Sequence, residues 1–340
     1  MRKLPIFFSF DDRYVTPAAV TFESLLSNAR PDVYYDLFVL YEDISKANQD
    51  RLSELVRRHG NATLRFIDVG VAFGRLSVRF NEQNFNLGPG QAGFTKETLF
   101  RCLPTLVEDF DGYDVILYSD VDVCIVDDIS DIFEEKLGDS YLAGCRLPAR
   151  YADQVQHVPE RFRPGYFAGG IWLMNLRQMR ADNLTARVIA IMRDPPFRLI
   201  WNDQDVMNLA CETRVTSLSY RYCSIPRWKT EFRAAGYADA HYPSGELREA
   251  LFRPKIVHYA ANKPWDGPCD DDELWHFWHT RTGFPTSPSN PKASENISAY
   301  FLKYLKLPTC FVRAQFRRGE LEVKIFGSIL RVRLKKIAEQ

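Results

Sequence analysis

The chain has 340 residues, 46% of them hydrophobic and 26% charged, which is typical of a globular enzyme and excludes disordered, collagen-like and coiled-coil proteins. Its 44 Lys and Arg balance 44 Asp and Glu, which argues against a protein that binds nucleic acid through its overall charge. Seven cysteines without a CxxC pair favour reduced thiols in the cytoplasm over a disulfide framework.

The first two hundred residues alternate between strand and helix patterns. Apolar runs predict strands at residues 4–10, 35–41, 63–67 and 115–119. Thr16 and Pro17 favour the start of a first helix, while Ser45 and Gly60 favour the start and end of a second. We expect another helix from about residue 96, after an Asn- and Gly-rich loop at 81–94. This order predicts a mostly parallel sheet with helices on both faces and a ligand site beyond the carboxyl ends of the strands.

The chain ends in a basic segment. Residues 285–291 predict a linker between a domain over 1–284 and an extension over 285–340. Residues 300–340 carry ten Lys or Arg and three Glu, interleaved with apolar residues. This amphipathic mixture favours binding to an anionic membrane surface, and the alternative is a helix and hairpin that cover the domain. No uncharged run reaches the roughly 18 apolar residues of a membrane span, and the short N-terminal run indicates a buried strand rather than a signal peptide.

Two carboxylates, Asp120 and Asp122, follow the apolar strand at 115–119 directly. Alternation along an extended backbone points both to the same side. Such a pair suits a hard divalent cation such as Mn²⁺ or Mg²⁺ better than a tetrahedral zinc site. The alternative is a solvated acidic turn, since three more aspartates follow at 127, 128 and 131.

Polar residues also follow the first predicted strand. Ser9, Asp11 and Tyr14 stand where an open α/β sheet holds a nucleotide, and a carboxylate there can accept hydrogen bonds from a uracil or a ribose. An ordinary strand-to-helix turn is the plainer interpretation. Small residues at 168–170 precede another apolar strand, which indicates the close approach of a ligand or of backbone.

The second half of the chain adds two polar segments. Asp203, Gln204 and Asp205 open a helix, where they could bind a ligand or only complement the helix dipole. His258 and Lys263 follow a strand at 255–257 and offer an imidazole to a metal and an ammonium group to a phosphate.

Two further histidines, His276 and His279, lie three residues apart after an acidic run at 270–273. They could ligate a second metal. The alternative, which we favour, is that the neighbouring aromatic residues pack this helix onto the domain while the acidic run forms its first turn.

Five segments resemble, in order and spacing, the motifs of glycosyltransferase family 8, which includes glycogenin and bacterial lipopolysaccharide α-galactosyl- and α-glucosyltransferases. They are Asp-Asp-x-Tyr at 11–14, Leu-Tyr-x-Asp-x-Asp at 117–122, Tyr-Phe-x-x-Gly at 166–170, Asp-Gln-Asp at 203–205 and His-Tyr-x-x-x-Lys-Pro-Trp at 258–265. The resemblance covers residues 4–266 and implies a GT-A-type α/β fold that binds a nucleotide sugar. Ala168 stands where the family usually has Asn, and the segment from His258 to Lys263 is one residue shorter than usual.

The resemblance implies a role for each matching residue. The implied ligands of Mn²⁺, or alternatively Mg²⁺, are Asp120, Asp122 and His258. The implied catalytic positions are Gln204, Asp203 and Asp205, with Gln204 beneath the anomeric carbon. The implied contacts to the nucleotide sugar are Ser9, Asp11, Tyr14, Arg101, Asp120, Val121, Asp122, Asp203 and Lys263.

The implied activity is metal-dependent transfer of a hexose, galactose or glucose, from a UDP-sugar to an oligosaccharide or lipid-linked glycan, with retention of configuration, in the synthesis of lipopolysaccharide or another cell-surface polysaccharide. Same-face attack is favoured because the Gln204 amide is a poor nucleophile, while Asp205 keeps double displacement open. A metal-dependent nucleotidyltransferase and a non-catalytic glycan-binding protein are the alternatives. We expect a cytoplasmic enzyme, peripheral on the inner face of the membrane if the extension binds lipid.

Overall fold

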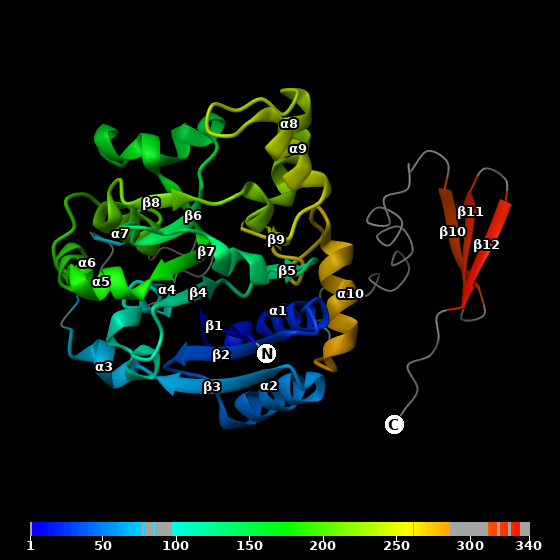
Figure 1. The fold of residues 1–340 in the computed structure, drawn as a ribbon, viewed down its shortest axis with the longest axis horizontal. Helices are drawn as coiled ribbons and strands as arrows, with labels where there is room; N and C mark the ends of the chain where they lie inside the picture. Colours follow the sequence, from blue (N-terminus) through cyan, green and yellow to red (C-terminus); the bar gives the residue numbers. More distant parts are fainter. Residues whose placement is uncertain are drawn as a thin grey trace. The chain divides into compact units, whose positions relative to one another are not determined.

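The structure is a computed structural model that describes residues 2–76, 78, 84–85, 97–260, 262–285, 312–317, 320–325 and 328–333. Most of the predicted loop at 81–94 and of the predicted linker at 285–291 lies outside these residues. The chain forms two compact units, Met1–Ala260 and Ala261–Gln340 (Figure 1). The predicted domain boundary at residue 285 stays a prediction.

A seven-stranded sheet forms the centre of the first unit. In spatial order its strands are β3 (Ala62–Asp68), β2 (Val33–Tyr41), β1 (Arg2–Ser9), β4 (Val115–Ser119), β7 (Phe167–Asn175), β6 (Leu142–Arg146) and β8 (Val215–Ser217). Neighbouring strands run parallel except at β7, which is antiparallel to both β4 and β6. The predicted mostly parallel sheet is therefore confirmed. A separate antiparallel pair joins β5 (Val123–Ile125) to β9 (Ile256–His258).

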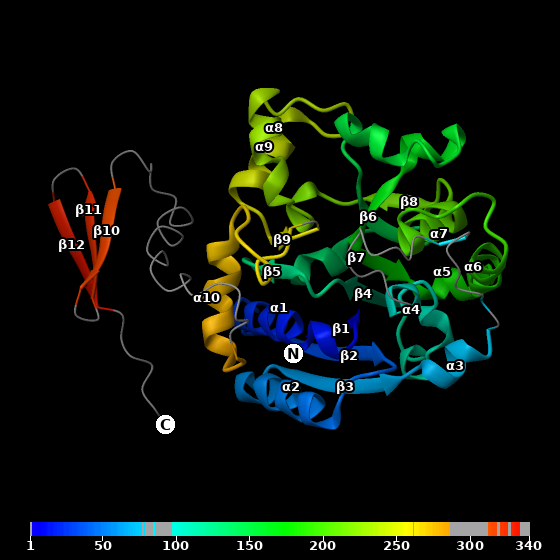
Figure 2. The ribbon, with the colours of Figure 1, turned by 180° about the vertical axis from the view of Figure 1, so that it is seen from behind.

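Helices cover both faces of this sheet. Among the described residues, the helices of the first unit are α1 (Val15–Ser27), α2 (Lys46–His59), α3 (Gly70–Gly74), α4 (Glu97–Phe100), α5 (Leu176–Ala181), α6 (Leu184–Arg193), α7 (Asn202–Cys211), α8 (Lys229–Ala234) and α9 (Ser244–Phe252). Alternation along β1 sends Phe8 to Phe22 of α1 and Phe7 to the opposite face, against Tyr118. Figures 1 and 2 show α5, α6 and α7 grouped beside β7 on that second face.

Local signals at the helix ends were partly right. Ser45 caps α2 and Gly60 ends it at a φ of 70°, as predicted. The first helix begins at Val15, because the side chain of Asp11 caps a preceding 3₁₀ turn, so Thr16 is not its cap. The helix expected from about residue 96 is only α4, and Pro104 opens a 3₁₀ turn soon after it.

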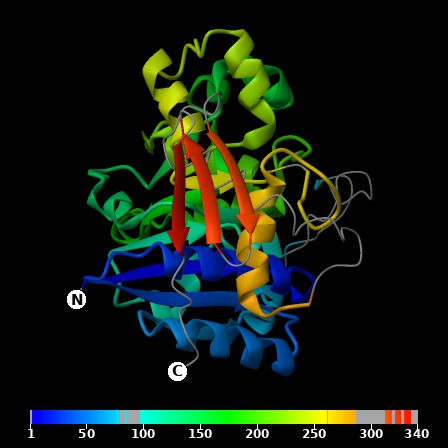
Figure 3. The ribbon, with the colours of Figure 1, turned by 90° about the vertical axis from the view of Figure 1, so that its right-hand side faces the viewer.

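The second unit holds α10 (Asp272–Thr282) and an antiparallel sheet of β10 (Val312–Arg317), β11 (Glu320–Ile325) and β12 (Ser328–Arg333), drawn in red in Figure 3. The expected alternative to membrane binding was a helix and a hairpin, whereas the backbone of this segment forms three strands. No helix among the described residues is long and apolar enough to span a membrane.

Candidate active site

Asp120, Asp122 and His258 meet where two strand pairs end. The backbone N–H of Asp120 donates to the Gly170 carbonyl at 2.7 Å as the chain leaves β4, and β5 then pairs Val123 with His258. His258 Nε2 lies 3.2 Å from Asp122 Oδ1 and 3.6 Å from Asp120 Oδ2. One ligand atom from each of the three side chains lies within 4.8 Å of the others, a match to the predicted metal site within the described ranges.

Gly170 makes room for the imidazole. A Cβ built on Gly170 would lie 2.5 Å from His258 Cε1 and 2.9 Å from His258 Nδ1. Its φ of 100° also lies in the region that only glycine adopts readily. The close approach of backbone indicated by the small residues at 168–170 is therefore to the candidate metal ligand His258.

Cys223 lies on the other nitrogen of the same imidazole. Its Sγ is 3.4 Å from His258 Nδ1, and both residues are buried. Burial opposes charge on the ring, but Asp122 and Cys223 together raise the pKa of His258 well above its ordinary value. The hydrogen bond with Cys145 and the neighbouring His258 in turn lower the pKa of the Cys223 thiol. The imidazole is thus held between two carboxylates and a thiol.

Arg101 joins the two acidic parts of the site. Its Nη1 lies 2.5 Å from Asp120 Oδ1 and its Nε 3.1 Å from Asp203 Oδ2. The guanidinium packs over the rings of Tyr118 and Trp172, with centroids at 4.6 and 5.6 Å. Burial alone would lower the pKa of Arg101, but Asp120 and Asp203 raise it, so the group stays charged. The structure therefore brings Arg101 into the site as the resemblance implied.

Asp203 and Gln204 lie in the first turn of α7, beside the start of β7. Burial raises the pKa of Asp203 to about 7, against the opposing effect of Arg101. Gln204 Oε1 accepts a hydrogen bond from Gly169 N, and Gln204 Nε2 donates to Tyr166 Oη at 3.1 Å. Both predicted residues therefore face the same region as the metal-ligand group.

Asp205 differs from its neighbours because protein donors surround it. It is fully buried. Its carboxylate accepts hydrogen bonds from His157 Nε2 at 2.9 Å, Tyr166 Oη at 2.6 Å, and the backbone N–H groups of Ile200 and Trp201 at 2.9 Å each. The Asp205 carboxylate thus binds hydrogen-bond donors of the protein itself.

The predicted nucleotide contacts lie at the carboxyl end of β1, which runs parallel to β4. Ser9 Oγ donates to the Glu97 carbonyl at 2.5 Å, and Tyr14 ends the 3₁₀ turn before α1. The Asp11 carboxylate accepts from Arg13 Nε at 2.9 Å. Because parallel strands end at one edge, this segment and Asp120 share an edge of the sheet.

Val121 stands between the two candidate metal carboxylates. It is buried, and its carbonyl accepts a hydrogen bond from Thr21 Oγ1 of α1 at 2.9 Å. The single hydrogen of this hydroxyl is shared with the Val123 carbonyl, which lies at the same distance of 2.9 Å. This internal contact ties the backbone between Asp120 and Asp122 to the helix layer.

Lys263 belongs to the second unit, where its Nζ lies 6.0 Å from the centroid of Trp265, so its contact with the diphosphate stays a prediction. In the same unit His279 stacks on Trp275 at 4.9 Å, and burial lowers the pKa of both His276 and His279. The packing of this helix onto the rest of the domain stays a prediction.

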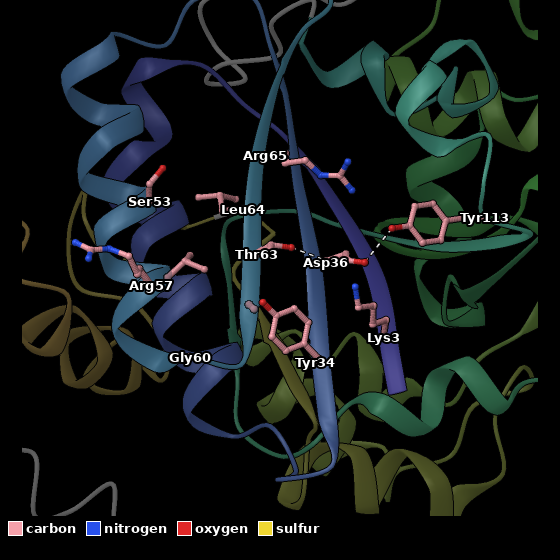
Figure 4. Close-up of a pocket in the computed structure, with 12 residues that line it drawn as sticks. Lys3, Tyr34, Asp36, Ser53, Arg57, Gly60, Thr63, Leu64, Arg65 and Tyr113 are labelled. Atoms are coloured by element: carbon pink, nitrogen blue, oxygen red, sulfur yellow. Dashed lines mark hydrogen bonds between the residues drawn. The ribbon is translucent and has the colours of Figure 1, made fainter. Parts of the chain in front are cut away.

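A cavity of about 690 Å³ opens elsewhere, at the edge strand β3 (Figure 4). Lys3, Tyr34 and Arg65 line it, and the buried Asp36 accepts hydrogen bonds there from Thr63 and Tyr113. The lining residues come from β1, β2, β3 and α2, with Tyr113 just before β4, while the candidate site lies at the carboxyl ends of the strands. We assign it no part in the chemistry, because its one carboxylate is already satisfied by protein hydroxyls.

Sequence reasoning missed several contributors to the site. Tyr118 donates a hydrogen bond to Asp120, Tyr166 joins Gln204 to Asp205, and Cys223 contacts His258. Tyr118 and Tyr166 fall within quoted motifs, where their hydroxyls could have been noted. Cys223 carries no local signal, since it stands 35 residues before its partner.

Comparisons with known proteins agree with this geometry. The model of glycosyl transferase family 8 matches residues 5–269, so the chain belongs to that family. It is 23% identical over 282 residues to general stress protein A of Bacillus subtilis, covering 79% of this chain and 93% of that protein. It is 20% identical to the lipopolysaccharide 1,3-galactosyltransferase of Salmonella typhimurium, covering 77% and 73%.

Solved structures share the fold. The galactosyltransferase LgtC in complex with donor and acceptor sugar analogs matches with a TM-score of 0.63 and 20% identity, over 85% of this chain and 98% of that one. The bifunctional glycosyltransferase WbbM matches with a TM-score of 0.66 and 24% identity, over 83% and 50%. The fold is thus that of the GT-A glycosyltransferases, as the resemblance implied.

Proposed function

We propose that this glycosyltransferase moves a hexose, galactose or glucose, from a UDP-sugar to a glycan acceptor in a metal-dependent reaction that retains configuration. The observation that carries the proposal is the junction of the Asp120, Asp122 and His258 group with Arg101 and Asp203 at one edge of the sheet. Family membership favours sugar transfer over the nucleotidyltransferase and the non-catalytic alternatives.

The donor set fits a hard divalent ion. The site offers two carboxylates and one imidazole, from Asp120, Asp122 and His258, which suit Mn²⁺ or Mg²⁺. Gly170 has no Cβ and so leaves room for the imidazole ring. When bound, the ion would act as a Lewis acid and neutralise the diphosphate as UDP departs. Lys263 would add a further positive charge to the same group.

The remaining residues would hold the donor. Ser9, Asp11 and Tyr14 would bind the uridine at the end of β1. Asp203 would accept hydrogen bonds from the sugar hydroxyls, with Arg101 keeping its carboxylate oriented.

The stereochemical course follows from two neighbouring side chains. Gln204 offers an amide oxygen near the anomeric carbon, where it can stabilise positive charge but nucleophilic attack is slow. Asp205 would have to leave four protein donors before it could attack. We therefore propose same-face attack by the acceptor through an oxocarbenium-like state. Proton NMR of the first-formed product should show an α-linkage, and a β-linked product would contradict retention.

Asparagine variants test the metal assignment. Asp120→Asn and Asp122→Asn should each abolish transfer and Mn²⁺-dependent UDP binding in calorimetry, because each removes a charged ligand. Asp127→Asn is the control, since that exposed carboxylate lies just beyond β5. Undiminished Mn²⁺-dependent UDP affinity in both site variants would refute the assignment.

We also propose that the basic extension holds the enzyme on the cytoplasmic face of an anionic membrane, near an oligosaccharide or lipid-linked acceptor of lipopolysaccharide or another cell-surface polysaccharide. Its net charge of +7 over residues 300–340 supports this, at about 1 kcal/mol per basic residue near the surface. The full chain should sediment with anionic vesicles and not with neutral ones. Changing Arg331, Arg333, Lys335 and Lys336 to Gln should release it. Continued sedimentation of that variant would show that these four basic residues do not hold the enzyme on the membrane.

A further inference from the structure

A continuous chain of hydrogen bonds runs from Gln204 to the surface of the first unit. Gln204 Nε2 donates to Tyr166 Oη at 3.1 Å, and Tyr166 Oη donates to Asp205 Oδ1 at 2.6 Å. His157 Nε2 contacts Asp205 Oδ2 at 2.9 Å. Tyr166 and Asp205 are buried, while the His157 side chain is 19% exposed. The three residues come from different parts of the fold: Tyr166 just before β7, Asp205 at the start of α7, and His157 in the turn between two 3₁₀ segments after β6.

This chain of hydrogen bonds has a fixed order of donors and acceptors, because the hydroxyl of Tyr166 can donate and accept in only one arrangement. Burial, with Asp205 beside it, raises the pKa of Tyr166, so the hydroxyl keeps its proton and donates it to the carboxylate. The hydroxyl oxygen is then left to accept, and the only group of Gln204 that can donate to it is the amide nitrogen. The charge on Asp205 thereby sets the orientation of an amide two hydrogen bonds away.

The opposite end of the amide is held as well. Gln204 Oε1 accepts from the backbone N–H of Gly169. A Cβ on Gly169 would lie 3.1 Å from that oxygen, so glycine leaves space for it at the start of β7. One lone pair of Oε1 is taken by this contact and the second stays available to a ligand. A flipped amide would instead point its NH₂ group at the Gly169 N–H.

We propose that Tyr166, Asp205 and His157 are positioning residues that keep the Gln204 amide oxygen, and not its nitrogen, turned toward the reacting sugar. The inference rests on the proposed function of Gln204. It gives Asp205 a task other than nucleophile, because its charge acts through Tyr166. A misoriented amide would present N–H groups to a centre that becomes positive in the transition state, which would slow the chemical step without weakening binding of UDP.

Tyr166→Phe removes one hydroxyl and so interrupts the chain of hydrogen bonds at its centre. Tyr141→Phe is the matched control, because the Tyr141 hydroxyl also donates to a carboxylate, Asp182, at 2.9 Å and accepts from a side-chain donor, Arg214, at 2.6 Å. We expect Tyr166→Phe to lower kcat about tenfold, with KM for the UDP-sugar and calorimetric affinity for UDP within about twofold of wild type. Tyr141→Phe should leave all three unchanged.

A double-mutant cycle shows whether Tyr166 acts through Gln204. In a Gln204→Ala background, Tyr166→Phe should have no further effect on kcat, because there is no amide left to orient. An undiminished tenfold effect in that background, or a wild-type kcat in Tyr166→Phe alone, would overturn the proposal. Wild-type activity of Gln204→Ala would instead refute the proposed role of Gln204 itself.

If the Tyr166→Phe variant does not fold, His157→Phe provides a second way to disturb the chain of hydrogen bonds. It removes a donor to Asp205 at the partly exposed end, and thermal unfolding reports whether each variant is folded. We expect a smaller loss of kcat than for Tyr166→Phe, again absent in the Gln204→Ala background. A loss that persists there would mean that His157 supports the fold alone, and would remove it from the proposal.

Discussion

Gly170→Ala is the sharpest test of how the fold positions the candidate metal ligand. The new Cβ would lie 2.5 Å from His258 Cε1 and 3.2 Å from Asp120 Oδ2. Ordinary contact between carbon atoms begins near 3.5 Å, so the imidazole or the strand must move by about 1 Å. The φ of 100° adds backbone strain of about 1–3 kcal/mol for any residue with a Cβ.

These displacements translate into separate effects on binding and stability. A ligand moved by about 1 Å should weaken Mn²⁺-dependent UDP binding by about 10- to 100-fold and lower transfer by about 100-fold. The strain should lower the melting temperature by several degrees, at roughly 2–4 °C per kcal/mol for a chain of this size. Raised Mn²⁺ concentration should restore part of the activity, because the defect lies in ion binding.

Calorimetry, UDP release and thermal unfolding measure the three effects in one preparation. Gly165→Ala is the control, since a Cβ at Gly165 meets nothing within 4 Å and the residue lies just before β7. A folded Gly170→Ala protein that binds Mn²⁺ and UDP as wild type does would refute the idea that this close approach places His258.

Three further variants or conditions probe the same site. Because the pKa of His258 is raised, Mn²⁺ must displace a proton, so its affinity should rise about tenfold per pH unit below that pKa, and calorimetry in different buffers should show about one proton released. Asp203 has a pKa of about 7 in the folded protein and about 3.9 in the unfolded chain, so its stabilising effect is present below pH 4 and is lost as the pH rises through 7. With the metal chelated, the stability of Asp203→Asn relative to wild type should therefore increase over that pH range, by at most about 4 kcal/mol, in denaturant titrations. Cys223→Ala should weaken Mn²⁺ binding about tenfold by freeing His258 Nδ1, while Cys211→Ala, at a buried thiol on α7, should not.

The fold was largely open to prediction from local patterns. Apolar runs and their order predicted β1 to β4 and the parallel sheet, because strands buried on both faces leave a continuous apolar signature. The predicted start of α1 was wrong, because the two adjacent carboxylates have different partners. Asp11 caps the 3₁₀ turn before the helix, while Asp12 accepts a hydrogen bond from the backbone N–H of Ser45. A local rule cannot tell which polar residue finds a distant donor.

The sequence predicted the candidate metal ligands but only some of the residues that contact them. Asp120, Asp122 and His258 carry motif signals, and the fold brings them together. The resemblance also implied Arg101, which contacts Asp120, whereas Cys223, which contacts His258, was missed because the two lie 35 residues apart in the sequence. Asp205 shows the opposite case, because its place in a motif suggested chemistry while its four donors keep it inside the protein.

The charges at the junction give a reason for the ion beyond ligand geometry. Three carboxylates, Asp120, Asp122 and Asp203, share one guanidinium, Arg101, and one imidazole. Above pH 7, where Asp203 is ionised, the group still carries a net negative charge with His258 protonated, and a second anion, the diphosphate of UDP, would increase it. A divalent cation that replaced the proton on His258 would cancel this excess negative charge before the diphosphate arrives. Nucleotide binding should therefore depend strictly on the ion, since without it two like-charged groups would have to meet in a buried place.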